Sequence, residues 1–432
     1  MIDDIRPPRP PKTKVAKKTA HHPPSHSRHE HRPEPGVDQP LSEIMPPIPE
    51  ITIPIDEHGK SKLSKNPVKN LKNLHPKHWY NLNRTEKIMS LAGAFLIFVG
   101  AWLAIYFLII KEGPAPISNT VTKVRAAPPP KPVTVEAPLT GIQIDPSLAK
   151  RPVTGIMVEN SLDARPQSGL QDAGVVYEAI AEGGITRFIG LFQDTRPQYI
   201  GPVRSLRPYY IDFATPWDAS IAHVGGSPEA LAQIRSSGKD LDQFFNSGSY
   251  WRQSSRVAPH NVYTSFDRLD ALNQSKGYAT SVPKGWKHKK DAPLKTPAAK
   301  SIDIAISSFY FNSHYDYDAA SNSYLRSEGG KPHIVTTSAA DGKGQQLNPK
   351  VVIALVISHG IESDGQHSVY GVNGSGNVYV FQDGGVTQGT WSKADRASQF
   401  DFKDAAGNEI ALNAGQAWVV AAGGDNLISY KP

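Results

Sequence analysis

Arginine, histidine and glycine residues gather between residues 159 and 260, and their types and spacing are those of an anion-binding pocket. A guanidinium binds two oxygens of a carboxylate or phosphate at once, and the free N–H groups at a helix start also attract anions. The arginines stand beside glycine or proline, at expected strand ends and helix starts. The candidate ligand-binding residues are Arg165, Arg187, Arg204, Arg207, His223, Gly225, Gly226, Ser227, Arg256 and His260.

The same arginines have a second interpretation, as structural braces. Glu159, Glu178, Glu182 and Asp212 lie in the same segment and could pair with them. A paired arginine contributes to folding and is not available to a ligand. The sequence leaves both interpretations open.

Acid or base chemistry in this segment would fall to His223 or Glu182. The sequence contains no Gly-x-Ser-x-Gly, no His-Glu-x-x-His and no cysteine, so a serine hydrolase or a tightly held zinc ion is not indicated. We expect no metal and no cofactor. Carboxylates such as Glu159 and Glu182 would hold Mg²⁺ only together with a phosphorylated substrate.

These residues must be positioned by helices and strands, and the order of helix and strand patterns in the sequence predicts an α+β fold. An α/β-like N-terminal ectodomain has strands over 151–159, 175–181, 186–193 and 220–224, and helices from Pro202 to Phe213 and over 229–236. Ser227 is the expected N-cap of the second helix, and Gly201-Pro202 the expected start of the first. From Ile302 to Ala421 the runs are β-like, so a β-rich C-terminal domain follows.

A membrane span precedes the folded part. Ile88 to Ile110 is an uninterrupted apolar run, long enough as a helix to cross a bilayer. Between Lys60 and Ile88 there are eight lysines or arginines against the single acid Glu86, which places the N-terminus in the cytoplasm and the C-terminal domains outside. We therefore expect a single-pass cell-membrane protein.

Charge divides at the same place. The chain has 20 basic and 12 acidic residues before Asp145, and 27 basic and 28 acidic residues from there on. The exported part therefore has no net positive charge for binding nucleic acid. Without cysteine it has neither disulfides nor the lipid-acceptor residue of a lipoprotein.

Composition predicts five regions. Residues 1–87 form a disordered, basic, proline-rich cytoplasmic tail that either binds a cytoplasmic partner or is a spacer. The span at 88–110 is followed by a proline-rich stalk at 111–146. An N-terminal domain at 147–290 and a C-terminal domain at 300–432 complete the chain.

The motifs of the folded part resemble a known family. RPVTGIMVEN, ARPQSGLQDAGVVYEAIAEGGITRF, IGPVRSLRPYY, AHVGGSPEAL and APHN, followed by GTWSKADRASQFDFKDAAGNEIALNAGQAWV, are similar to the YerB-like bacterial lipoproteins over Ser147 to Pro432. This resemblance implies an N-terminal and a C-terminal domain of unknown function on an exported, membrane-attached protein. Here the span at 88–110 replaces the lipid anchor.

A fainter likeness is to the LytR-CpsA-Psr phosphotransferases, which transfer glycopolymers from polyprenyl-pyrophosphate carriers to the cell wall. Arg187 and Arg204 match two arginines around the pyrophosphate of that family. The aspartates that follow those arginines are replaced by Phe188 and Ser205. The likeness implies a basic pocket and leaves metal-dependent catalysis without its ligands.

Three functions follow from these patterns. The first is an envelope protein that binds a phosphorylated lipid or glycan through the arginine pocket. The second is a phosphotransferase with Arg187 and Arg204 on the pyrophosphate. The third is a scaffold that links a cytoplasmic partner to the envelope.

Overall fold

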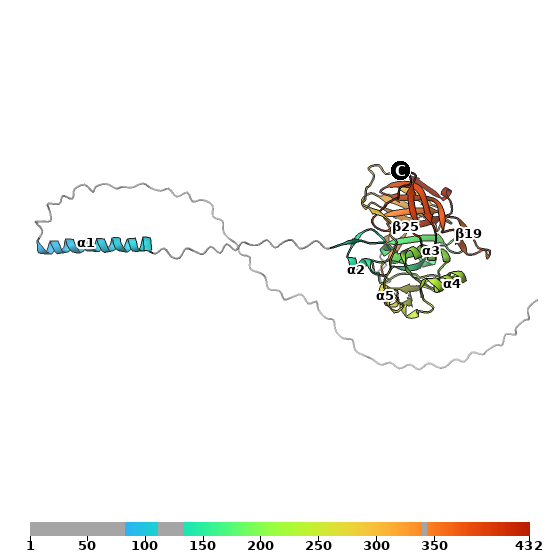
Figure 1. Ribbon diagram of the computed structural model, residues 1–432, viewed down its shortest axis with the longest axis horizontal. Helices are drawn as coiled ribbons and strands as arrows, with labels where there is room; N and C mark the ends of the chain where they lie inside the picture. The colour runs from blue at the N-terminus through green and yellow to red at the C-terminus, as the bar shows by residue number, and fades with distance from the viewer. Residues whose placement is uncertain (1–82, 111–132, 339–343) are drawn as a thin grey trace, which may run out of the picture. The chain divides into compact units, whose positions relative to one another are not determined.

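The computed structural model describes residues 83–110, 133–338 and 344–432. The chain divides into two compact units, residues 1–122 and 123–432 (Figure 1). The expected disorder and partner of the tail fall on residues 1–82, outside the described part. Residues 133–432, as far as they are described, are called the body below.

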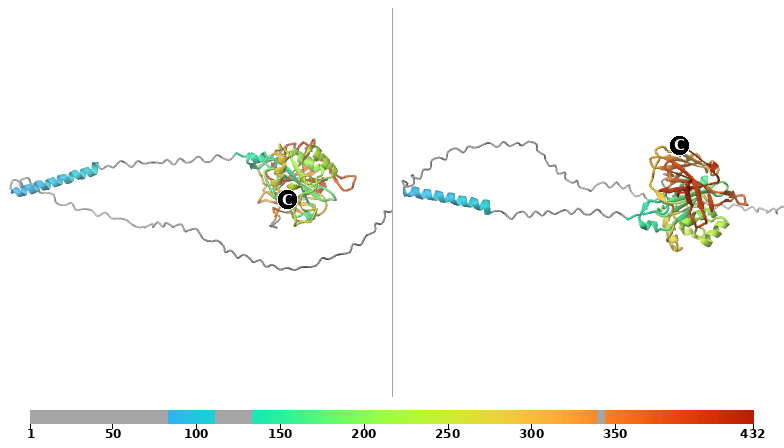
Figure 2. Two further views of the ribbon diagram at one scale, coloured as in Figure 1. Left: turned by 90° about the horizontal axis from the view of Figure 1, so that it is seen from below. Right: turned by 45° about the horizontal axis from the view of Figure 1, so that its top comes forward.

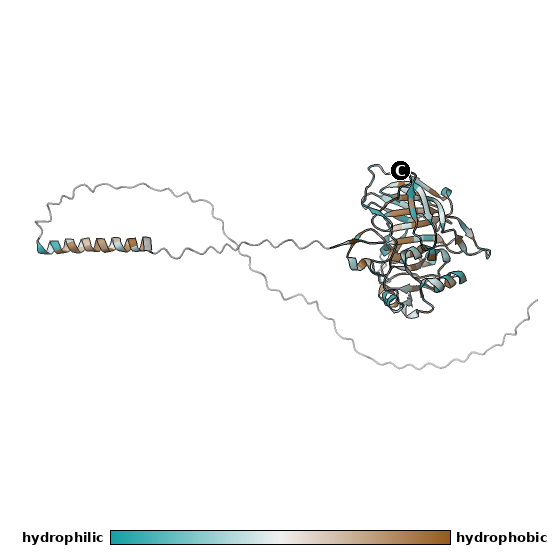
Figure 3. Ribbon diagram, viewed as in Figure 1, coloured by the Kyte–Doolittle hydropathy of each residue, from teal (hydrophilic) through white to brown (hydrophobic). Residues whose placement is uncertain are grey.

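An apolar helix, α1, forms the described part of the first unit. It runs over Arg84–Ile105 and continues as a π-helical turn over Tyr106–Ile110. It begins before the expected Ile88 because Asn83 caps it: the Glu86 N–H donates to the Asn83 side chain at 3.1 Å, and the Asn83 N–H donates to the Glu86 carboxylate at 3.0 Å. Beyond its polar N-terminal end, α1 is mostly apolar (Figure 3), and none of its apolar window is buried. The segment Arg84–Leu108 has the length and hydropathy needed to cross a bilayer.

One ten-stranded mixed sheet forms the centre of the body and takes strands from both expected domains. Its order is β23 (Asp401–Asp404), β22 (Gly385–Lys393), β21 (Gly374–Gln382), β18 (Val351–Val356), β25 (Ala417–Ala422), β5 (Val175–Ile180), β6 (Thr186–Phe192), β3 (Thr154–Glu159), β7 (Ser220–His223) and β8 (Lys239–Asp242). The two halves meet where β25 runs parallel to β5, with Ala417 opposite Val175. The domain boundary between 290 and 300 stays a prediction, but strands on its two sides belong to one sheet.

The central strands are apolar because both faces of the sheet are covered. Every residue of β25, β5, β6 and β3 is buried. Strands buried on both faces read as nearly continuous apolar runs. The expected strands at these positions and at β7 are confirmed.

Four helices of four to ten residues accompany the N-terminal strands: α2 (Pro146–Ala149), α3 (Pro208–Ala214), α4 (Pro228–Ser237) and α5 (Phe266–Ser275). α4 is capped as expected, because Ser227 Oγ accepts from the Ala230 N–H at 3.3 Å. The expected helix start at Pro202 was wrong, since α3 begins at Pro208.

Long-range backbone hydrogen bonds explain the late start of α3. The Val203 N–H donates to Val262 O at 2.7 Å, and the Arg204 N–H donates to Met157 O at 3.0 Å. An N–H that bonds to a neighbouring segment cannot also form the i to i−4 bond of a helix. One of the two expected anion-attracting helix starts is therefore an extended segment.

The C-terminal part is β-rich. A second sheet has the order β15 (Lys331–Pro332), β14 (Ser323–Glu328), β13 (Ser313–Asp318), β12 (Ser301–Ile304) and β26 (Ile428–Lys431). The smaller pairings are β17 (Gly344–Gln346) with β16 (Ile334–Thr336) and β4 (Gln167–Ser168), β1 (Val135–Glu136) with β2 (Gln143–Ile144), β9 (Tyr250–Arg252) with β10 (Val262–Thr264), β11 (His288–Lys289) with β24 (Leu412–Asn413), and β19 (His359–Ile361) with β20 (Ser368–Tyr370). The right-hand view of Figure 2 shows the orange and red C-terminal strands above the green helix-bearing N-terminal part. The α+β class is confirmed at this level, as a mixed α/β region followed by a β-rich part.

Candidate functional site

Arg187 and Arg207 form a brace with Glu182. Arg187 Nη2 lies 2.9 Å from Glu182 Oε2, and Arg187 Nη1 donates to Ser205 O at 2.7 Å. Arg207 pairs with the other Glu182 oxygen, and both arginine side chains are only 7% exposed. Glu182 is thus shared between two guanidiniums. For these residues the geometry fits the brace interpretation and not a ligand pocket or a catalytic base.

His223 and the Gly225 turn connect β7 to α4. His223 is fully buried, its Nδ1 lies 2.8 Å from Gly225 O, and its Nε2 lies 3.0 Å from Asp240 Oδ1. Gly225 has a φ of +60°, which favours glycine, and its N–H donates to Asp242 Oδ1 at 3.0 Å. Gly226 forms an isolated parallel β-bridge with Leu206. These residues, with the cap Ser227, hold the turn between β7 and α4 together.

A cavity in another part of the body brings together three of the predicted residues, Arg165, Arg256 and His260. Its volume is about 700 Å³. Its wall is formed by the loop after β3, the segment after β6, the loop between β9 and β10, and the end of β16 with the residues after it. The lining residues are Asp163, Arg165, Pro166, Tyr199, Ser255, Arg256, Val257, Ala258, His260, Thr336 and Ser338. We call it the Arg256 cavity.

Arg256 is the arginine of this cavity that has no carboxylate partner. Its Nη1 donates to Asp163 O at 3.4 Å, its Nη2 donates to Pro166 O, and its guanidinium lies 6.0 Å from the centre of the Tyr263 ring. Within the described residues no ion pair involves Arg256. Its positive charge is therefore held in place by neutral groups and remains available to an anion.

His260 stands on the same wall and is oriented by Glu159. His260 Nδ1 lies 2.8 Å from Glu159 Oε1, and its Nε2 is 4.0 Å from the exposed carboxylate of Asp163. The same Glu159 oxygen accepts from Ser161 Oγ at 2.9 Å and lies 3.2 Å from Arg204 Nε. Glu159 thus gathers His260 and Arg204 at the end of β3. Arg204 is braced by Glu159, whereas His260 reaches the cavity.

Arg165 forms the boundary between the Arg256 cavity and a second cavity. It donates to Asn160 O at 3.2 Å and Tyr310 O at 2.9 Å, and its Nε lies 3.3 Å from a Glu328 oxygen. Its guanidinium also lies 5.3 Å from the centre of the Phe311 ring. Arg165 is 19% exposed at its side chain, so it is fixed in place but open to both cavities.

The second cavity has a volume of about 460 Å³ and a largely apolar wall. It is lined by Leu162, Arg165, Pro166, Tyr310, Glu328, Gly329, Lys331, Pro332, His333 and Ile334. Arg165 and Pro166 line both cavities. The two spaces therefore adjoin, and the residues between them come from the N-terminal half.

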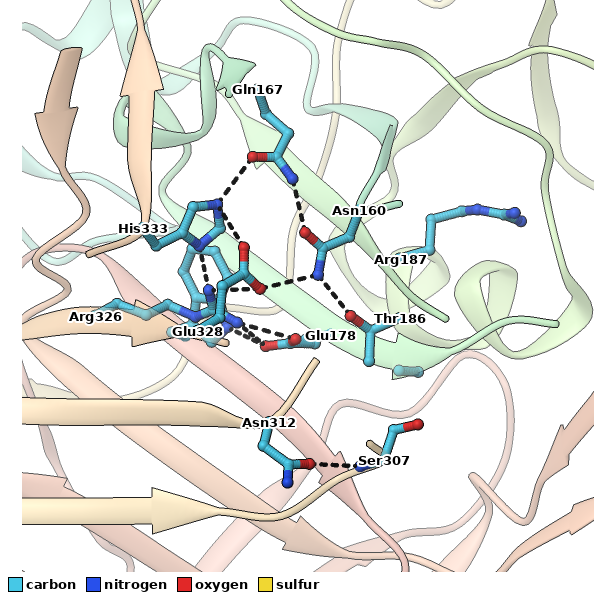
Figure 4. Close-up of polar contacts among 12 residues, drawn as sticks. Asn160, Gln167, Glu178, Thr186, Arg187, Ser307, Asn312, Arg326, Glu328 and His333 are labelled. Atoms are coloured by element: carbon cyan, nitrogen blue, oxygen red, sulfur yellow. Dashed lines mark hydrogen bonds and ion pairs between the residues drawn. The ribbon is translucent and has the colours of Figure 1, made fainter. Parts of the chain in front are cut away.

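A buried charged network joins Glu178, Arg326 and Glu328 (Figure 4), and Arg165 pairs with its member Glu328. Arg326, fully buried on β14, donates through Nη2 to both Glu178 oxygens at 3.0 and 2.9 Å, and its Nη1 lies 3.3 Å from Glu328. Trp418 Nε1 donates to Glu178 at 2.9 Å. The network joins β5, β14 and β25, and thus links the N-terminal and C-terminal halves.

Amide side chains continue the network to the loop after β3. Asn160 Nδ2 donates to Glu328 at 3.0 Å and to Thr186 Oγ1 at 2.7 Å. Gln167 Nε2 donates to Asn160 Oδ1 at 2.7 Å, and Gln167 Oε1 accepts from His333 Nε2 at 3.0 Å. The loop that carries Arg165 is thereby tied to the core.

Sequence reasoning missed most of this network. Glu178 was named only as a brace for nearby arginines, but its partner is Arg326, which is 148 residues away. The available signal was a lone acid inside the apolar run of β5, because a charge in a buried strand needs a partner. Nothing local identified Arg326, Glu328 or His333.

One group of side chains that could hold a metal ion lies in a turn outside both cavities. Of the described residues, Glu362, Asp364 and His367 have ligand atoms within 4.8 Å of one another. They lie between β19 and β20 and are largely exposed, and His367 already pairs with Asp364. This group is separate from the residues that line the Arg256 cavity.

Comparisons with known proteins agree with the resemblance. Residues 139–279 match a family described as "Protein of unknown function (DUF3048) N-terminal domain", and residues 302–419 match the corresponding C-terminal domain. The chain is 32% identical over 268 residues to "Putative lipoprotein YerB" of Bacillus subtilis (strain 168), over 60% of this chain and 79% of that protein. The crystal structure of YerB protein from Bacillus subtilis matches with a TM-score of 0.61 and 28% identity, over 69% of this chain and 100% of that one.

Proposed function

We propose that this protein, which belongs to the YerB-like family with its two DUF3048 domains of unknown function, binds an anionic envelope ligand, a phosphorylated lipid or glycan, in the Arg256 cavity. The observation that carries the proposal is Arg256 itself, a guanidinium on the wall of the cavity whose partners are backbone carbonyls. Arg165 and His260 add donors on the same wall. Charge-assisted bonds of this kind are the stronger class of hydrogen bond.

The proposed ligand contacts differ from those first expected. Arg187 and Arg207 both pair with Glu182, and Arg204 pairs with Glu159, so none of these three carries the proposal. The cavity is lined by two arginines, one histidine and one exposed acid, Asp163, together with hydroxyl groups. A few placed polar groups in a concave site suit a small anionic group.

Replacement of Arg256 tests the proposal. We expect Arg256→Gln to weaken binding of methyl phosphate by about 10- to 100-fold, since a hydrogen bond to a charged group contributes roughly 1.5 to 3 kcal/mol. The full chain in phosphatidylcholine nanodiscs is titrated by calorimetry, with phosphate release followed in the same samples. Because Arg256 also donates to two backbone carbonyls, we expect a small lowering of the unfolding midpoint, no larger than that of the control variant Arg268→Gln.

Arg268→Gln is the matched control. Arg268 also donates to two backbone carbonyls, of Gly248 and Tyr250, and lies 5.0 Å from the centre of the Trp251 ring, but it does not line the cavity. Equal binding losses in the two variants, or full binding by Arg256→Gln, would overturn the proposal.

A second candidate function is an enzyme that uses His260 as acid or base. The observation that favours it is a buried carboxylate, Glu159, that orients an imidazole on a cavity wall. In the LytR-CpsA-Psr-like alternative, metal-dependent release of phosphate or glycan is expected. If the protein is a scaffold, we expect neither binding of an anionic ligand nor catalytic release of phosphate or glycan.

The membrane arrangement is also part of the proposal: α1 spans the membrane once, the N-terminus is cytoplasmic and the body is outside. The relative's description as a lipoprotein agrees with attachment at the envelope. Because the chain has no cysteine, single cysteines report topology without background. We expect a membrane-impermeant maleimide on intact cells to label Ser429→Cys, at an exposed position, and to label Ser25→Cys only after permeabilisation. The reverse labelling pattern would refute this topology.

A further inference from the structure

We infer that the anionic ligand is an amphiphile, with its phosphate or carboxylate head in the Arg256 cavity and a hydrocarbon chain in the adjoining second cavity. The inference rests on the proposed function and names the class of ligand. It is carried by the contact between a polar and an apolar cavity that share Arg165 and Pro166.

The wall of the second cavity exposes large apolar side chains. Leu162 is 51% exposed, Tyr310 is 53% exposed and Ile334 is 38% exposed. Phe309 is 64% exposed beside Gly330, which borders this wall. Apolar groups gathered in one concave patch are unusual on a soluble surface and mark a binding site for an apolar group.

Charge decides which end of the ligand enters which cavity. Glu328 lines the second cavity, is only 4% exposed, and has one carboxylate oxygen, Oε1, without a hydrogen-bond donor among the described residues. Its ion pair with Arg165 lies at the boundary between the cavities. An anionic head in the second cavity would approach this carboxylate, and the cations there are Arg165, which Glu328 already pairs, and the exposed Lys331. In the first cavity the head meets Arg256, which has no ion pair among the described residues, and the acid there, Asp163, is exposed to water that screens its charge.

The chemistry thus favours a ligand with one hydrocarbon chain, which runs from the anionic head past Arg165 into the second cavity. A hydrocarbon chain gains free energy for each methylene removed from water, which gives about a three- to fourfold gain in affinity per buried methylene. A peptide with an apolar side chain is the competing occupant, and it would not need a phosphate or carboxylate beside the chain.

The experiment is a chain-length series from methyl to hexyl phosphate, titrated into the full chain in phosphatidylcholine nanodiscs, with empty nanodiscs as the blank. We expect the affinity to rise at least 100-fold across the series. Ile334→Asn and Leu162→Asn should flatten the series and leave methyl phosphate binding unchanged. Ile361→Asn, at an exposed isoleucine of β19 outside both cavities, should keep the full gain.

The outcomes separate the two proposals. A flat series with methyl phosphate still bound overturns the amphiphile and leaves the anion site standing. No binding of methyl phosphate overturns the anion site. The amphiphile proposal is also overturned if hexanol binds as tightly as hexyl phosphate. It is likewise overturned if affinity still rises with chain length in both Ile334→Asn and Leu162→Asn. Displacement of hexyl phosphate by phosphatidic acid in the nanodisc supports a bilayer lipid as the source, and its absence supports a soluble ligand.

Discussion

Arg326→Met lowers the free energy of unfolding at pH 7 by about 3–5 kcal/mol, the cost of leaving buried charges without their partner. Arg326 is fully buried and is the only cation paired with Glu178 among the described residues. Burial raises the pKa of Glu178, so this carboxylate will take up a proton when Arg326 is removed. Denaturant unfolding of the full chain in detergent, followed by tryptophan fluorescence, measures the loss.

Two further variants show whether orphaned charge is the cause. Arg326→Met combined with Glu178→Gln and Glu328→Gln should regain part of the loss, because neutral amides replace the buried carboxylates. Lys403→Met is the exposed control: its ion pair with Asp401 has half-exposed side chains, and we expect a loss of at most about 1 kcal/mol. A loss below about 1 kcal/mol for Arg326→Met would show that the network contributes little to stability.

Acidification will destabilise the body through His333. Arg326 donates to His333 Nδ1, so Nδ1 carries no proton and Nε2 donates to Gln167. Burial lowers the pKa of His333 from 6.5 to about 3, while the unfolded chain keeps an ordinary histidine pKa.

The sign follows from proton uptake. Between pH 6.5 and about 3 the unfolded chain binds a proton that folded His333 does not, so stability is complete above pH 6.5 and falls as the pH is lowered. At pH 4.5 the titration of His333 lowers the free energy of unfolding by about 2–3 kcal/mol relative to pH 7. Urea unfolding at pH 7 and at pH 4.5 checks it, and His333→Gln should show a smaller difference between the two pH values.

His314→Gln is a control of opposite sign. Burial lowers the pKa of His314, but Asp303 and Asp316 outweigh burial and leave this pKa raised. Its contribution is therefore present below pH 6.5 and is lost as the pH rises through the folded pKa. The His314→Gln variant should lose slightly more stability on acidification than the unchanged protein. An unchanged pH dependence in His333→Gln would contradict the proposed neutral state of His333.

Local patterns were enough for several elements. The apolar run at 88–110 predicted α1, which starts earlier, at Arg84, because of the Asn83–Glu86 cap, and continues from Tyr106 to Ile110 as a π-helical turn. Apolar runs predicted the central strands, and Ser227 with Pro228 predicted the start of α4. Each of these depends on side chains within a few residues of one another.

Long-range contacts decided the remainder. Pro202 looked like a helix start, but the residues after it bond to Met157 and Val262. The arginines between 165 and 256 looked alike in sequence, yet Arg187, Arg204 and Arg207 are each paired with an acid, whereas Arg256 donates to backbone carbonyls and has no ion pair among the described residues.

The sequence by itself determined an apolar span, a cysteine-free folded part of nearly zero net charge, and the family to which that part belongs. Only the tertiary structure decided that β25 lies beside β5, that Arg326 neutralises Glu178, and that Arg165 stands between two cavities. The physical reason is that burial and charge pairing depend on which distant segments meet. Side-chain type and local spacing state what a residue can bind, and the packing of distant strands selects the partner it has.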